Sequence, residues 1–143
     1  GWALHGSDRA ITSGTNEFKN DRWQGGGMRF LRFKHWLTEI KQMAGGLDAV
    51  FAEEVRRHAG VDASHAYGGW LAILTAWCEH HQIPYEAVPV GTIKRHATGK
   101  GNANKDAMIA AARSHGFDPI DDNEADALAL LGWAMEHRMI GAP

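Results

Sequence analysis

An acidic run opens an apolar helix near the end of the chain, and it constrains the fold more than any other segment. The run reads Asp121-Asp122-Asn123-Glu124-Ala125-Asp126, and Leu128, Leu130 and Leu131 follow it. Positions 122 and 126, and also positions 123 and 126, share a helix face. Acids at a helix start cap it and compensate its dipole. Asp126 lies one turn further in, where a carboxylate needs a cation or a donor to offset desolvation, and a hard divalent metal ion would supply that.

Composition predicts one globular domain over residues 1–143, because 143 residues that are 44% hydrophobic can bury an ordinary core. A formal net charge of -2 means that any nucleic-acid contact must use local basic patches. The single cysteine, Cys78, excludes an internal disulfide and fits a reducing cytosol, and we expect it in or near the core. No apolar run predicts a membrane span. The nine histidines show no HExxH or paired Cys/His spacing, so the sequence predicts no zinc site, despite His80-His81.

Periodicity predicts strands and helices that are mixed along the chain, and therefore an α/β fold. The expected strands cover residues 2–5, 9–13, 48–55 and 84–90. The expected helices follow the Gly-rich segment 23–27 and cover residues 63–82, 103–115 and 123–138; the first of them stops at Gly45-Gly46. Residues 91–102 are expected to form a polar loop. Trp70, Trp77 and Trp133 lie on helical apolar stripes and are expected in the core.

Two further segments carry candidate chemistry. Glu53-Glu54 ends the predicted strand after residue 48, and open α/β sheets place their sites beyond strand ends. Adjacent strand residues point to opposite faces, so only one of the two can join a given site. The segment Gly99-Lys100-Gly101-Asn102-Ala103-Asn104-Lys105 lacks Walker A spacing, but it places two lysines and backbone N–H groups at a helix start, which suits a phosphate. Taken alone, each segment is also compatible with a solvated strand end or a capped loop.

In combination, these segments resemble the RuvC family of Holliday-junction resolvases, in the RNase H-like nuclease superfamily, and especially its phage and prophage versions. The resemblance covers residues 48–137 in order and rests on Val50-Phe51-Ala52-Glu53-Glu54-Val55, Val90-Gly91-Thr92-Ile93-Lys94, the Gly99–Lys105 segment, and Asn123-Glu124-Ala125-Asp126-Ala127-Leu128-Ala129. It implies an RNase H-like mixed sheet flanked by helices. It also implies that the family's first strand, with its catalytic Asp, precedes Gly1, so that the domain is N-terminally incomplete.

The resemblance implies a role for each candidate residue. Glu53 and Asp126 would be metal ligands, and Lys100 and Lys105 would lie near the scissile phosphate, with Lys105 among the catalytic residues. Asn123 stands where the family usually has Asp, so its neutral amide would join the metal site, with Asp122 or Glu124 compensating for the lost charge. The DNA-binding set is expected to be Lys94, Arg95, Lys100, Lys105 and Arg56. Arg56 and Arg57 follow the strand where the family often has an aromatic, which favours charge over stacking in junction engagement.

The leading hypothesis is therefore a Mg²⁺-dependent endonuclease, with Mn²⁺ as the alternative ion, that cleaves branched DNA as a homodimer in the cytoplasm of a bacterial or phage-infected cell. Two-metal phosphodiester cleavage needs carboxylates from separate elements. One alternative is an RNase H-like nuclease that acts on another nucleic-acid structure. A second is a non-catalytic DNA-binding or scaffold module of the same fold. A phosphate-binding metabolic enzyme lacks a nucleotide fingerprint here.

Overall fold

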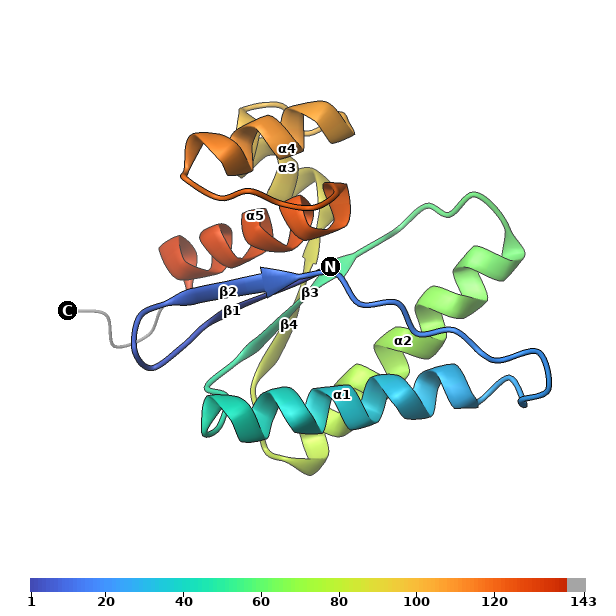
Figure 1. The fold of residues 1–143 in the computed structure, drawn as a ribbon. Coiled ribbons are helices and arrows are strands. Elements are labelled where there is room, and N and C mark those ends of the chain that lie inside the picture. The colour runs from blue at the N-terminus through green and yellow to red at the C-terminus, as the bar shows by residue number, and fades with distance from the viewer. Residues whose placement is uncertain (139–143) are drawn as a thin grey trace. The chain divides into compact units, whose positions relative to one another are not determined.

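A computed structural model describes residues 1–138, and within it the chain forms two compact units (Figure 1). Among the described residues, the first unit contains residues 1–16, 51–54 and 87–138. The second contains residues 17–50 and 55–86. The expectation of a single nuclease domain over residues 1–143 stays a prediction.

Helices and strands are mixed along the described residues, which confirms the expected α/β class. The strands are β1 (Trp2–His5), β2 (Ile11–Gly14), β3 (Val50–Glu54) and β4 (Tyr85–Pro89). The helices are α1 (Met28–Ala44), α2 (Val61–His80), α3 (Val90–Thr98), α4 (Lys105–Ser114) and α5 (Asp122–His137). Strands β1 and β2 form one sheet, and β3 and β4 form another.

In the first unit, β1 and β2 form an antiparallel hairpin that packs against α5 (Figure 1). Trp2 pairs with Gly14 and His5 with Ile11. A Cβ at position 14 would lie 3.1 Å from the Trp2 indole nitrogen, so a larger residue there would require the indole to shift. Helices α3, α4 and α5 pack against one another and bury Val88, Ile93, Met108, Ala125, Leu128 and Trp133.

The first turn of α5 is fixed by its own acids. Asp121 is the N-cap, and its carboxylate accepts hydrogen bonds from the Glu124 backbone N–H and the Thr15 hydroxyl, at 2.9 and 2.8 Å. Glu124 is buried, with 8% of its surface exposed. Its carboxylate accepts from the Ser13 hydroxyl at 2.8 Å and from the Ile120 backbone N–H at 2.7 Å. This arrangement is a variant of the capping box, and it also ties β2 to α5.

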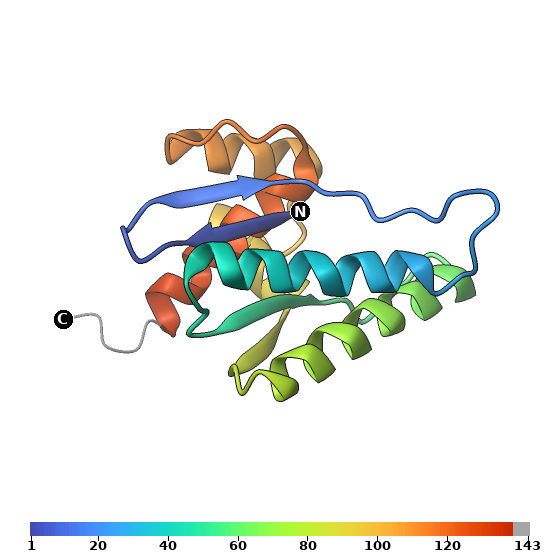
Figure 2. The same ribbon diagram turned by 60° about the horizontal axis from the view of Figure 1, so that its bottom comes forward.

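In the second unit, α1 and α2 lie side by side and bury a separate core (Figure 2). Leu37, Trp77, Cys78 and Ile83 form its centre, and the Trp77 indole N–H donates to the Thr38 hydroxyl at 3.2 Å. Cys78 is fully buried, as expected, and burial followed by the nearby Glu79 raises the pKa of its thiol to about 11. The thiol is therefore protonated and unreactive at neutral pH.

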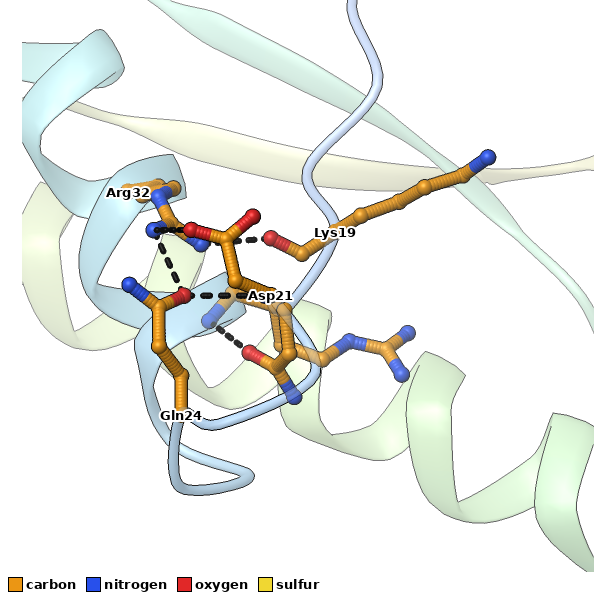
Figure 3. Close-up of polar contacts among 6 residues, drawn as sticks. Lys19, Asp21, Gln24 and Arg32 are labelled. Atoms are coloured by element: carbon orange, nitrogen blue, oxygen red, sulfur yellow. Dashed lines mark hydrogen bonds and ion pairs between the residues drawn. The ribbon is translucent and has the colours of Figure 1, made fainter.

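The segment that precedes α1 is held by Arg32 (Figure 3). The Arg32 guanidinium donates to the Lys19 carbonyl and to Gln24 Oε1, and it lies 3.6 Å from Asp21 Oδ2. Gln24 Oε1 also accepts from the Asp21 backbone N–H at 2.9 Å. These contacts fix the base of a loop whose Trp23 is 87% exposed.

The predicted boundaries agree with the structure to within about two residues, except in one segment. Gly45, with φ of 73°, ends α1 in the left-handed conformation, as the Gly45-Gly46 stop predicted. Trp77 and Trp133 are buried, and Trp70 is half-buried against the rings of Phe30 and Phe33. The prediction of a polar loop over residues 91–102 is wrong for its first part, because Val90–Thr98 is helix α3. The segment is mostly polar, and Ile93 is its buried residue. Packing of α3 against α4 and α5 stabilises the helix, which the intrinsic helix propensity of the segment would not do alone.

We expect Glu124→Ala to lower the free energy of unfolding by roughly 2–4 kcal/mol, because the Ser13 hydroxyl and the Ile120 N–H both lose a charged acceptor. Urea denaturation would measure the change. The matched control is Asn123→Ala, at an exposed position in the same turn, which should shift stability by less than about 0.5 kcal/mol. Equal effects of the two substitutions would contradict the role assigned to Glu124.

Candidate active site

Glu53 and Asp126 converge within the first unit from a strand end and a helix start. Glu53 is the penultimate residue of β3, and Asp126 lies in the second turn of α5. Both are half-buried, and they lie close enough for the Glu53 charge to act on Asp126. The alternation of strand side chains directs the neighbouring Glu54 to the opposite face of β3. The structure thus brings together two carboxylates that are 73 positions apart in the sequence.

Burial dominates the electrostatics of this pair. Burial first, then the charge of Glu53 and more weakly that of Asp122, together raise the pKa of Asp126 to about 6, while Lys94 opposes the rise. Burial also raises the pKa of Glu53, again opposed by Lys94. Two like charges in a partly desolvated place are costly unless a cation neutralises them.

Lys94 is a cation that the protein itself provides to this pair. It was expected among the DNA-binding residues, and the structure places it on α3, half-buried and near both Glu53 and Asp126. Sequence reasoning missed this position because it treated the segment as a loop. A helix from Val90 to Thr98 with Ile93 buried would have placed Lys94 beside the site.

The other acidic and amide candidates lie in the first turn of α5, and their surroundings differ. Asp122 is half-buried, its charge acts on Asp126, and its Oδ2 lies 4.0 Å from Lys105 Nζ. Asn123 is exposed, and its backbone carbonyl lies against Gly1. Glu124 is held by Ser13 and Ile120, so its carboxylate is already engaged in the fold. Asp122 is therefore better placed than Glu124 to add charge to the pair.

A basic surface segment follows the site along the chain. Gly99, with φ of 83°, ends α3, and Asn104 caps α4 by accepting from the Ala107 N–H at 2.9 Å. Lys100 and Lys105 are both exposed, and the Lys105 side chain is 80% exposed. The Arg95 guanidinium packs so close to Gly101 that a Cβ there would come within 2.8 Å of it. Arg56, the remaining candidate, is exposed and belongs to the second unit.

The donor set of the carboxylate pair fits a hard divalent ion. Glu53, Asp126 and Asp122 offer oxygen ligands, which Mg²⁺ and Mn²⁺ prefer. Burial is the first cause of the raised pKa values of Glu53 and Asp126, so ionising these carboxyls is costly. A bound cation would lower that cost.

No helix within residues 1–138 is long and apolar enough to cross a membrane.

We expect Asp126→Asn to stabilise the metal-free protein increasingly as the pH rises from 4 to 7. The carboxyl has a folded-state pKa of about 6, above its ordinary value of 3.8, so its ionisation costs the folded protein stability across that interval. Asn does not ionise, and the melting temperatures of variant and wild type should diverge with pH. The control is Asp118→Asn, whose side chain is 94% exposed. An Asp126→Asn offset that is the same at pH 4 and pH 7 would contradict the desolvated carboxylate.

The comparisons with known proteins concern the fold. No protein-family model and no curated protein sequence matches the chain. Among solved structures, "T. thermophilus RuvC in complex with Holliday junction substrate" is similar, with a TM-score of 0.75 and 21% sequence identity over 96% of this chain and 86% of that chain. "Thermus thermophilus RuvC structure" gives a TM-score of 0.63 and 21% identity over 85% of this chain and 70% of that chain. The chain therefore has a RuvC-like, RNase H-like α/β fold.

Proposed function

We propose that this chain is a divalent-metal-dependent endonuclease that cleaves branched DNA of the Holliday-junction type. The observation that carries the proposal is the meeting of Glu53 and Asp126, with raised pKa values, in a fold similar to that of RuvC. One of the similar structures is a RuvC bound to a Holliday junction substrate. The cellular setting is the cytoplasm of a bacterial or phage-infected cell.

Three carboxylates would hold the metal ions. Glu53 and Asp126 would be the principal ligands, Asp122 would add charge from the same helix face, and the exposed Asn123 could add its amide oxygen. Mg²⁺ or Mn²⁺ bound there would stabilise the attacking and leaving oxygens of the phosphodiester.

The two lysines near the site have different tasks. Lys94 is half-buried beside both carboxylates, and it would keep them ionised and pair with a phosphate oxygen of the substrate. Lys105 is exposed and lies 4.0 Å from Asp122, so it could swing to a phosphate at the edge of the site. Lys100, Arg95 and Arg56 would extend backbone contacts, which give affinity without base information.

An exposed aromatic offers a stacking contact at a place the sequence did not indicate. Trp23 is 87% exposed, and the Arg22 guanidinium lies 5.1 Å from its ring centroid. The Arg32 contacts hold the base of this loop (Figure 3), so the indole is presented from an ordered support. Unpaired bases at a branch point stack on such side chains. Junction engagement would then combine charge with stacking, and not charge alone.

A homodimer would suit this substrate, because a two-fold axis would place two sites on opposing strands of a symmetric junction. The competing functions are an RNase H-like nuclease with another substrate and a non-catalytic module that binds DNA. Substrate choice separates the first of these from the proposal, and metal dependence separates the second.

We expect Glu53→Gln and Asp126→Asn each to lower Mg²⁺-dependent cleavage of a synthetic four-way junction by roughly 100-fold or more, since precisely placed charge contributes effects of that size. Junction affinity, measured in Ca²⁺ or EDTA, should stay near wild type. Asp118→Asn is the control and should cleave normally, because Asp118 is exposed and outside the pair.

Three outcomes would contradict parts of this assignment. Near-wild-type cleavage by either variant would remove that residue from the site. Junction binding without cleavage by the wild type in Mg²⁺ and in Mn²⁺ would favour the non-catalytic module. Faster cleavage of an RNA–DNA hybrid than of the junction would favour another nucleic-acid substrate.

We expect Lys100→Ala/Lys105→Ala and Trp23→Ala to weaken junction binding in distinguishable ways. Loss of two phosphate contacts should flatten the dependence of log K on log salt by roughly one unit per contact. Loss of a stacked base should lower affinity by about 1–3 kcal/mol with the slope unchanged, because stacking releases no counterion. Fluorescence anisotropy at several salt concentrations would measure both.

The control for the double lysine variant is another surface lysine. Lys19 pairs with Glu17 at 3.0 Å, so Lys19→Ala should change the slope less than either loop lysine. An unchanged slope in the double lysine variant would mean that the segment after α3 does not touch phosphate. If Trp23→Ala bound the junction with wild-type affinity, Trp23 would not stack on a base, and charge alone would account for binding.

A further inference from the structure

Three metal-ligating side chains gather where α3 and α5 lie side by side, away from the carboxylate pair. His96 comes from α3, and Glu136 and His137 come from the end of α5. One ligand atom from each lies within 4.8 Å of the other two. His96 Nε2 and Glu136 Oε2 are 2.5 Å apart, and the two imidazole rings are 5.4 Å apart at 75°.

The orientation of His137 is already that of a ligand. Its Nδ1 lies 2.9 Å from the Trp133 carbonyl oxygen, which can only accept, so Nδ1 carries the proton. The neutral ring then has its lone pair on Nε2. Metal-bound histidines are held in this way by a carbonyl or carboxylate partner. The ring also stacks on the buried Trp133 at 5.0 Å and 14°, which limits its rotation.

The electrostatic setting favours a cation. His137 lies in the last turn of α5, and His96 lies in the last turn of α3. Helix C-termini carry partial negative charge from unpaired carbonyls, and the last turns of two helices each supply a histidine to this group. The Glu136 carboxylate adds a full negative charge. Its pKa is lowered by the hydrogen bond with His96, so it is ionised at neutral pH.

We propose that His96, Glu136 and His137 form a binding site for a divalent transition-metal ion of the zinc class. Two imidazoles and one carboxylate suit Zn²⁺ or Co²⁺ and disfavour Mg²⁺, which prefers oxygen ligands. Water would complete the tetrahedral coordination. Ten residues separate Asp126 from Glu136 along α5, or about 15 Å at the helical rise, so this site is distinct from the carboxylate pair.

The site would act as a clip between two helices. α3 carries Lys94, and α5 carries Asp126, so a metal bridging His96 to Glu136 and His137 would fix the helices that position both. The sequence did not predict this group, because His96 lies 40 positions before Glu136 and the three residues fit no single-segment zinc motif. The adjacent pair His80-His81, which the sequence does display, belongs to no such group of three within residues 1–138.

The test is metal binding by the full 143-residue protein, freed of metal with EDTA and held in excess Mg²⁺ so that the carboxylate pair is occupied. Zn²⁺ calorimetry and the visible absorption of Co²⁺ should report one strong site. His96→Ala, His137→Ala and Glu136→Gln should each weaken binding by roughly 100-fold or more, beyond the effect of losing an outer-shell partner. Zn²⁺ should also raise the melting temperature of the wild type and not of these variants.

Two controls locate the ion. The double variant His80→Ala/His81→Ala should bind Zn²⁺ as the wild type does, and so should Asp126→Asn. Glu136→Gln changes an exposed side chain and keeps its shape, so it tests the site even if His137→Ala disturbs the packing on Trp133. Wild-type Zn²⁺ affinity in Glu136→Gln and His96→Ala, or loss of binding in the His80/His81 variant, would overturn the proposal.

Discussion

The buried carboxylate of Glu124 is the contact on which the rest of the first unit depends. By accepting from the Ser13 hydroxyl and the Ile120 N–H, it fixes the rotation of α5 against the β1–β2 hairpin. That rotation decides which acids face inward. Asp122 and Asp126 lie on the face that meets Glu53, while Asn123 is left exposed. Glu124, whose role is structural, therefore positions Asp122 and Asp126, the carboxylates assigned to the site.

Partial desolvation is the physical cost of the carboxylate pair. The fold places Glu53 and Asp126 where burial raises both pKa values, and Lys94 offsets only part of that penalty. Two partly buried carboxylates close enough to repel each other are costly to ionise. A divalent cation bound between them would relieve that cost, which is why we assign chemistry to this pair.

The same helix carries two clusters of different character at its two ends. At the start of α5 the donors are carboxylate oxygens, which favour Mg²⁺ or Mn²⁺. At its end the donors are two imidazoles and one carboxylate, which favour zinc-class ions. Each cluster also takes a residue from α3, Lys94 at one end and His96 at the other. Helix α3 therefore contributes to both clusters. Because its polar sequence was interpreted as a loop, neither the position of Lys94 nor that of His96 was predicted.

The sequence alone determined the α/β class, the stop of α1 at Gly45, the acidic start of the last helix near residue 123, and the candidacy of the Glu53-Glu54 strand end and of Asp126. These follow from local rules, because caps, periodicity and the chemistry of an acid in an apolar stripe are readable within a few residues. Only the tertiary structure decided that Val90–Thr98 is a helix, that Lys94 faces the carboxylates and that Glu124 does not. It alone assembled His96 with Glu136 and His137. The physical reason is that these features depend on helix rotation and on contacts between segments tens of residues apart, which no local pattern encodes.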